Sequence, residues 1–263
     1  MSYADVNGLS LYYAEHGSGE PLVLLHGGFG SGEMFGPALA GLARHRRVIA
    51  VDLQAHGRTA DAGRPLRFET MADDVAALIG HLGLIRSDLM GVSLGGGVAL
   101  RTAIQHPEAV DRLVLVSAPF RRDGWFPEIG AAMRRFSPAQ AEAMKRSPMY
   151  ATYARVAPRP GDWPVLHAKM GELLSADYDW SAEVAALTAP TMLVYADSDS
   201  IRPAHMVEFF ALLGGGLRDA DWDGSDRPTG RLAIMPGTTH YDIVVSPALA
   251  APVLEFLEAP TLD

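Results

Sequence analysis

Residues 89–97 read LMGVSLGGG, an apolar run that leads into a single serine among four glycines. A glycine inside a helix or strand costs about 0.5–1 kcal/mol relative to alanine, so four of them need a structural reason. Residues 91–95 fit G-x-S-x-G, the pattern of a strand that turns sharply into a helix with Ser93 at the turn. The glycines two positions before and after the serine give this strained turn its clearance. Gly96 and Gly97 predict that the following helix packs closely on the sheet.

The segments on both sides of this turn alternate between strands and helices. The runs at 113–118 and 191–196 are almost continuously apolar, which is typical of strands buried on both faces of a parallel sheet. Their alternation with amphipathic helices predicts an α/β fold with a mostly parallel, twisted sheet flanked by helices. The expected strands are residues 9–15, 21–25, 47–52, 87–93, 113–118, 191–196 and 231–235, and the expected helices are residues 69–83, 94–107 and 248–259.

Residues 119–187 interrupt this alternation because they contain no clear strand. They hold three of the four tryptophans together with several methionines and prolines, and we interpret them as a helical insertion. The predicted domains are therefore a core of residues 1–118 and 188–263 and an inserted unit of residues 119–187. The tryptophans and methionines fit an apolar substrate pocket, and they fit simple packing within a small helical unit equally well.

The composition excludes several classes of protein. The 263 residues are 48% hydrophobic, which is enough for a sizeable core. Lys and Arg total 22 against 31 Asp and Glu, and the net charge of −9 argues against a nucleic-acid partner. The lack of cysteine excludes disulfides, thiolate catalysis and cysteine-bound metal centres. There is no secretory-signal pattern and no apolar run of the roughly 18 residues that span a membrane, so we expect a cytoplasmic protein with no membrane partner.

A serine hydroxyl needs a base before it can act as a nucleophile. Among the nine histidines, His240 stands out because it lies in a turn directly after the last expected strand. In a parallel α/β sheet this places it at the carboxyl edge, where ligands bind. The base in turn needs an acid that orients it and stabilises its charged form. Asp197 and Asp199 both follow the strand at 191–196, and both are candidates.

Acyl transfer also needs two backbone N–H groups that point at the developing negative oxygen. One should come from Leu94, which follows Ser93 at the start of a helix. The second should come from the turn HGGFG at residues 26–30, where small residues let the backbone approach a substrate. The sequence thus predicts an oxyanion hole beside the serine.

Five segments of the chain resemble the α/β-hydrolase fold superfamily, and the resemblance covers essentially its whole length. They are LLHGGFGSGEMF (24–35), VIAVDLQAHGRT (48–59), MGVSLGG (90–96), YADSDSIRP (195–203) and PGTTHYD (236–242). The chain departs from the family's pattern at Ala55 and Ala196, which replace glycine, and at Thr59, which replaces serine. These are exchanges between small residues, and we expect them to leave the assignment intact.

The resemblance implies a residue for each role in catalysis. The acid loop aligns on Ile201 and Pro203, and this alignment selects Asp199 as the acid. The resulting chain order of serine, aspartate and histidine matches the order of the family. The resemblance also places the second N–H of the oxyanion hole on Gly28, with Phe29 as the alternative.

By the same resemblance, Ser93 attacks an acyl carbonyl and His240 carries the serine proton to the leaving alcohol, after which water hydrolyses the acyl-enzyme. Residues 119–187 lie where the family inserts its cap. We expect the substrate to be a small or medium carboxylic ester with an apolar or aromatic acyl or alcohol part. A serine at this turn counts against the haloalkane dehalogenases and epoxide hydrolases of the same fold, which use an aspartate there.

Other functions stay open because function depends on the site rather than on the fold. The same residues can cleave a lactone, an amide or a carbon–carbon bond next to a ketone, or act as a perhydrolase. A small-molecule receptor that keeps the fold without turnover is a hypothesis of another class. The chain lacks the motifs G-x-x-x-x-G-K-[ST], G-x-G-x-x-G and H-E-x-x-H, so we expect no cofactor and no metal. A homodimer stays open as the assembly.

Overall fold

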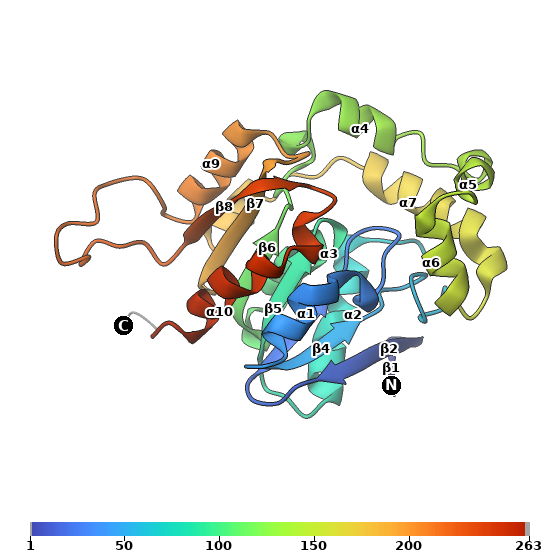
Figure 1. Ribbon diagram of the computed structural model, residues 1–263, viewed down its shortest axis with the longest axis horizontal. Helices are drawn as coiled ribbons and strands as arrows, with labels where there is room; N and C mark the ends of the chain where they lie inside the picture. Colours follow the sequence, from blue (N-terminus) through green and yellow to red (C-terminus); the bar gives the residue numbers. More distant parts are fainter. Residues whose placement is uncertain (1, 261–263) are drawn as a thin grey trace.

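The computed structural model describes residues 2–260, which form an eight-stranded sheet with helices on both faces (Figure 1). The strand order is β1-β2-β4-β3-β5-β6-β7-β8. Neighbouring strands from β4 to β8 in that order pair in parallel, whereas β2 runs antiparallel to both β1 and β4. Residue 1 and residues 261–263 of the predicted core lie outside the described part of the chain. The strands are β1 Ser2–Val6, β2 Leu9–His16, β3 Pro21–Leu25, β4 Arg47–Val51, β5 Ser87–Val92, β6 Val110–Val116, β7 Thr191–Ser198 and β8 Arg231–Thr239.

Both faces of the sheet are buried, because alternate residues of a strand point to opposite sides. In β3, Leu22 and Leu24 pack with α1 and α10, whereas Val23 and Leu25 pack with the layer that contains α2 and α3. The predicted α/β class with a mostly parallel sheet is therefore confirmed. The helices are α1 Gly36–Leu42, α2 Phe68–His81, α3 Leu94–Gln105, α4 Pro127–Met133, α5 Pro138–Met144, α6 Pro148–Val156, α7 Trp163–Ser175, α8 Ser181–Ala185, α9 Pro203–Leu212 and α10 Ala250–Glu258.

Three elements of the core, β1, α1 and α9, are absent from the expectations above. The first of them has a clear signal in the sequence. Asn7 and Gly8 both have positive φ, at 49° and 76°, and Val6 pairs with Leu9 across this two-residue turn. An Asn-Gly pair between short strands is the strongest local signal of a hairpin. The helix α1 is only seven residues long, too short for a clear helical period.

Residues 119–187, called the helical insertion below, contain α4 to α8 and contribute no strand to the sheet within the described residues. The insertion leaves the core after β6 and returns before β7. Its Trp125 ring lies 5.3 Å from the ring of His240, which follows β8, so the insertion approaches the carboxyl edge of the sheet. Figure 1 shows α4 to α7 arranged along this side of the molecule. The division into two domains stays a prediction.

The chain between α9 and β8 forms a long loop that extends away from the rest of the molecule (Figure 1). The Trp222 side chain in this loop is fully exposed. Among residues 2–260, no helix combines the length and the apolar character needed to cross a membrane.

Candidate active site

Ser93 lies at the turn between β5 and α3 in a strained backbone conformation, with φ 52° and ψ −113°. Such a conformation costs about 1–3 kcal/mol in a residue other than glycine and persists only where the surroundings fix it. Here the Ser93 N–H donates a 2.9 Å hydrogen bond to the carbonyl of Val116 at the end of β6. A Cβ at Gly91 would lie 2.1 Å from the Gly95 oxygen, and a Cβ at Gly95 would lie 2.3 Å from the Leu25 oxygen. Both glycines are therefore required by backbone that passes too close for a side chain.

Of the next two glycines, Gly96 meets the expected neighbour and Gly97 does not. A Cβ at Gly96 would lie 2.5 Å from the Cβ of Ala118, which follows β6, so this glycine does bring α3 close to the sheet. A Cβ at Gly97 would lie 2.5 Å from the ring of Phe68, the first residue of α2. Gly97 thus makes room for a neighbouring helix, and the expectation that it serves packing on the sheet is wrong.

The structure brings the serine, the histidine and one of the two candidate aspartates together. His240 Nε2 lies 3.1 Å from Ser93 Oγ, and His240 Nδ1 lies 2.9 Å from Asp199 Oδ1. The Asp199 side chain is fully buried and that of His240 is 11% exposed. Asp197 is exposed and accepts a 2.8 Å hydrogen bond from the Gly237 N–H instead. Three residues from the ends of β5, β7 and β8 thus form one hydrogen-bonded chain.

Asp199 keeps its charge in spite of its burial. Burial acts to raise the pKa of its carboxyl, but the hydrogen bond and charge of His240, together with hydrogen bonds from Ser117 and Ala196, hold that pKa below its usual range. Ser117 Oγ donates to Oδ2 at 2.5 Å, and the Ala196 N–H donates to the same oxygen at 3.0 Å. A third donor, the Ile201 N–H, lies 3.2 Å from Oδ1. An ionised carboxylate facing Nδ1 favours the imidazole tautomer that leaves Nε2 free to accept a proton from the serine.

The amide groups predicted for the oxyanion hole lie beside Ser93. Leu94 is the first residue of α3, where a helix has N–H groups without a partner. The turn after β3 passes close by, since a Cβ at Gly27 would lie 3.6 Å from Ser93 Cβ and one at Gly28 would lie 4.0 Å from Leu94 Cβ. Within residues 2–260, the N–H groups of Leu94, Gly28 and Phe29 donate to no protein acceptor. Both candidates for the second donor are thus available, and Phe29 has a positive φ of 60°.

His26 holds this turn in place, a role that the sequence did not reveal. Its Nε2 accepts a 3.0 Å hydrogen bond from the Leu53 N–H, so its proton is on Nδ1, which donates to the Gly27 oxygen at 2.7 Å. Burial lowers the pKa of His26 to about 4, and burial also lowers the pKa of the neighbouring His56 to about 3. Both rings are therefore neutral near pH 7 and act as parts of the scaffold.

The predicted departures from the family's pattern have different consequences. Ala55 has a positive φ of 64°, a conformation that favours glycine. Thr59 keeps the hydroxyl of the serine it replaces, because its Oγ1 donates to the Asp52 oxygen at 2.6 Å and accepts from the Tyr12 N–H at 2.9 Å. Ala196 contacts Asp199 through its N–H alone, while its methyl group is buried in the apolar layer on one face of the sheet. None of the three exchanges displaces the site.

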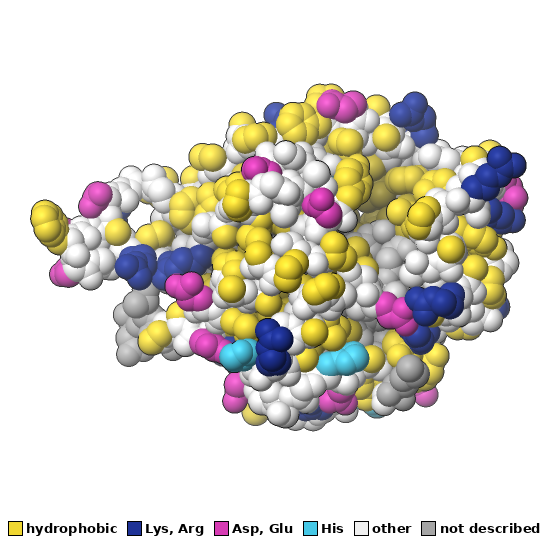
Figure 2. All heavy atoms as spheres, viewed as in Figure 1, with side chains coloured by type: hydrophobic (Ala, Val, Ile, Leu, Met, Phe, Trp, Pro, Cys, Tyr) yellow, Lys and Arg dark blue, Asp and Glu magenta, His cyan; other side chains and the backbone are white. Residues whose placement is uncertain are grey.

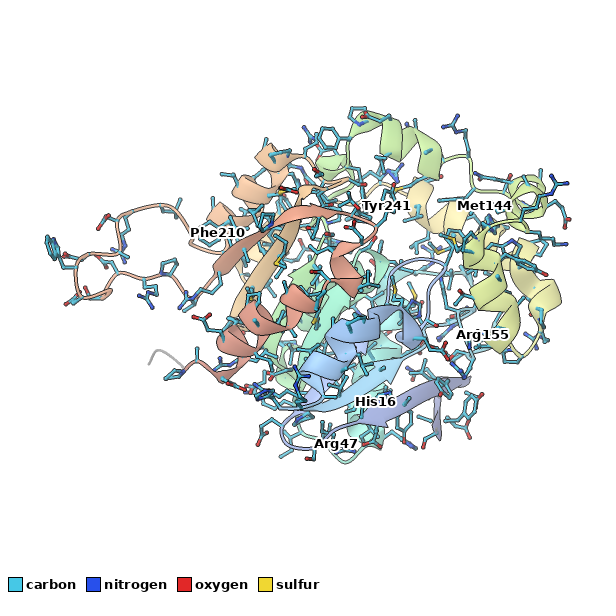
Figure 3. All side chains as sticks on the ribbon, viewed as in Figure 1. His16, Arg47, Met144, Arg155, Phe210 and Tyr241 are labelled. Carbon is cyan, nitrogen blue, oxygen red and sulfur yellow. The ribbon has the colours of Figure 1, made fainter. Side chains whose placement is uncertain are left out.

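Apolar side chains of the helical insertion surround the site. Besides Trp125 next to His240, the Met170 methyl of α7 lies near Gly28, since a Cβ there would be 2.8 Å from it. The Phe29 ring packs against Trp163 of α7, with ring centroids 5.5 Å apart. Figure 2 shows hydrophobic side chains around a hollow in this face, and Figure 3 labels Tyr241, the neighbour of His240, at its border. Among residues 2–260, no three His, Asp or Glu side chains gather in a way that could hold a metal ion.

Comparison with known proteins identifies the family of the chain. A family model described as the alpha/beta hydrolase fold matches residues 20–151, half of the chain. The AB hydrolase superfamily protein YisY of Bacillus subtilis is 29% identical over 232 residues, which cover 81% of this chain and 85% of that protein.

Two solved structures share the fold over nearly the whole chain. A thermophilic esterase from Thermogutta terrifontis has a TM-score of 0.70 and 24% identity, with 95% of this chain and 93% of that chain covered. The enol-lactonase from Burkholderia xenovorans LB400 has a TM-score of 0.71 and 23% identity, with 98% and 100% covered. At these identities the likeness concerns the fold.

Proposed function

Because the chain belongs to the alpha/beta hydrolase fold family, we propose that it is a serine hydrolase that cleaves a carboxylic ester through an acyl-enzyme. The observation that carries this proposal is the hydrogen-bonded chain from Ser93 through His240 to the buried Asp199. A nucleophile within reach of a base, and a base oriented by a third group, is the arrangement that activates a hydroxyl for acyl transfer. Near neutral pH the Asp199 carboxyl is ionised, since its pKa lies below the usual range.

Each residue has one task in the proposed reaction. His240 Nε2 takes the proton of Ser93 as its oxygen attacks the acyl carbonyl, and Asp199 stabilises the imidazolium that forms. The N–H groups of Leu94 and of Gly28 (or Phe29) donate to the oxyanion of the tetrahedral intermediate. His240 then protonates the leaving alcohol. In the second half His240 takes a proton from the water that attacks the acyl-enzyme, and it returns this proton to Ser93 Oγ as the carboxylic acid leaves.

The side chains around Ser93, His240 and Asp199 support an apolar acyl or alcohol part in the ester. Trp125 lies next to His240, and Met170 and Phe29 lie next to the proposed oxyanion hole. Burial of apolar substrate surface against such side chains contributes about 25 cal/mol per Å². The helical insertion would act as the cap that excludes water from the acyl group.

A panel of p-nitrophenyl acyl esters of increasing chain length tests the proposal. Wild type should hydrolyse esters of short or medium chain, and Ser93→Ala should lose at least about 10³-fold in kcat. The matched control is Ser87→Ala, because Ser87 begins the strand that Ser93 follows and its hydroxyl contacts only backbone oxygens. Equal turnover by wild type and Ser93→Ala would contradict the proposal.

The competing reactions of the same residues are separated by substrate. A panel of lactones and of amides beside the esters gives a ratio of kcat/KM values, and the ester should be preferred. A receptor without turnover would bind ligand and fail to react with a fluorophosphonate probe at Ser93.

A further inference from the structure

The end of β6 contacts both ends of the proposed catalytic chain. The Val116 oxygen accepts the hydrogen bond from the Ser93 N–H, and the next residue, Ser117, donates its hydroxyl to Asp199 Oδ2 at 2.5 Å. The Ser117 N–H donates in turn to the Val194 oxygen of β7 at 2.8 Å. Two successive residues thus connect the strand of the nucleophile to the strand of the acid.

Ser117 is in a backbone conformation that serine rarely adopts. Its φ is 50°, it is fully buried, and Ser93 is its counterpart at the end of the neighbouring strand. Left-handed residues other than glycine are uncommon, and they cluster at functional sites where the surroundings hold them. A glycine would satisfy this φ without strain, so the presence of a side chain here needs a reason other than the turn.

The hydroxyl of Ser117 supplies that reason. Asp199 receives two donors on each oxygen, namely His240 and the Ile201 N–H on Oδ1, and Ser117 and the Ala196 N–H on Oδ2. Ser117 is the donor that a single substitution removes without touching the backbone or the base. A hydrogen bond to a buried carboxylate is stronger than one between neutral groups, and its loss leaves charge uncompensated.

We propose that Ser117 is a positioning residue that holds the Asp199 carboxylate ionised and turned toward His240. The proposal rests on the proposed function, since it acts through the acid of that mechanism. It makes the working unit a chain of four side chains, in which Ser117 orients the acid, the acid orients the base, and the base activates the nucleophile. Ser117 touches no substrate.

The test compares Ser117→Ala and Ser117→Gly with wild type and with the control Ser87→Ala. Both Ser117 variants lose the hydroxyl, but glycine also relieves the positive φ, so the pair separates the hydroxyl from backbone strain. Each protein is assayed with its best p-nitrophenyl ester across pH, and its melting temperature is recorded. We expect kcat to fall about 10- to 100-fold in both variants while KM changes less than about twofold. At the acid end of the pH profile, the kcat/KM of both variants should fall further below that of wild type, because Asp199 loses a donor that keeps its pKa low and therefore takes up a proton at higher pH.

The rate at which a fluorophosphonate labels Ser93 gives a second readout that needs no turnover. Labelling should slow in both Ser117 variants and stay unchanged in Ser87→Ala. If wild type is reactive and the Ser117 variants keep its kcat and its pH profile, the positioning role is overturned and the proposed function stands. Full activity in Ser117→Gly alone would also overturn it, because strain would then explain the loss in Ser117→Ala. A wild type that neither hydrolyses esters nor labels overturns both proposals.

Discussion

Around Ser93 the polypeptide is fixed by close backbone contacts, whereas the helical insertion is joined to the core by charged side chains in addition to apolar packing. At the turn, the glycines of α3 lie against carbonyl oxygens of β3 and against the Phe68 ring. On α7, Lys169 Nζ donates to both carboxylate oxygens of Asp61 at 2.7 Å and to the backbone oxygen of Arg64 at 2.6 Å. On α6, Arg155 pairs with Glu33 of the core (Figure 3).

The backbone contacts at the turn and the ion pairs of the insertion differ in how well they tolerate substitution. Backbone cannot move aside for an added methyl group without shifting a strand, so one atom at the turn affects several elements. An ion pair between long side chains can rearrange or admit water, and it weakens gradually. A change at the turn should therefore disrupt the fold abruptly, whereas loss of the ion pairs between the insertion and the core should weaken that contact in steps.

The largest effect should come from Gly95→Ala. Its Cβ would meet the Leu25 oxygen at 2.3 Å and the His26 oxygen at 2.5 Å, so we expect a loss of at least about 4 kcal/mol in the free energy of unfolding, or no folded protein. The matched control is Gly80→Ala in α2, where a Cβ meets nothing within 4 Å and alanine should stabilise the helix by about 0.5–1 kcal/mol. Urea unfolding of both variants decides. A Gly95→Ala protein as stable as wild type would contradict the claim that the backbone around Ser93 tolerates no added methyl group.

A fall in pH should lower the stability of the fold through His26 and His56, the two buried histidines next to the turn. His26 and His56 are neutral in the folded protein, with pKa values lowered to about 4 and about 3 from 6.5. The unfolded chain therefore binds more protons below pH 6.5, and stability that is present above this pH is lost as the pH falls. Between pH 6.5 and 4.5 we expect a loss of about 2–3 kcal/mol for each histidine.

Urea midpoints measured at intervals from pH 7 to 4.5 give this profile. The variant His56→Gln lacks one of the two groups, so its stability should fall less steeply than that of wild type. A wild-type midpoint that stays level across this range would show that the two rings do not remain neutral in the folded state.

A smaller effect should follow from Lys169→Met, which leaves the Asp61 carboxylate without its cation. The two side chains are only 14% and 10% exposed, so the pair is partly shielded from water. We expect a loss of about 1–3 kcal/mol in the free energy of unfolding and faster proteolysis within residues 119–187, since α7 loses one of its contacts with the core. The control Lys145→Met removes an exposed pair with Glu142 inside the insertion and should change neither quantity measurably. Equal behaviour of the two variants would mean that Lys169 does not anchor the insertion.

The comparison also explains how much the sequence could predict. The turn and its two partner residues, Asp199 and His240, were readable because their signals are local: glycines around a serine, and polar residues after two later strands. The choice of Asp199 over Asp197 needed the family resemblance. Ser117 was hidden because residues 113–118 read simply as the end of a strand, and its hydrogen-bond partner lies 82 residues away. The hairpin at Asn7 was readable from its Asn-Gly pair, but α9 and the short α1 carry no comparable signal.

The contacts of the insertion were out of reach for a physical reason. Lys169 and Asp61 are 108 residues apart, and each resembles any other charged residue on a helix or loop. Pairing over such distances follows from how the insertion folds back on the core, which no local pattern records. The partners of Gly97 were misjudged in the same way, because its neighbour Phe68 comes from another helix.

The central claim is that Ser93 is a nucleophile activated by His240, and one measurement tests it most directly. A fluorophosphonate is allowed to react with wild type and with His240→Gln, and mass spectrometry locates and times the adduct. The account predicts a single adduct on Ser93 in wild type and a rate at least about 10³-fold slower in His240→Gln. An adduct elsewhere, or an equal rate in the two proteins, would contradict it.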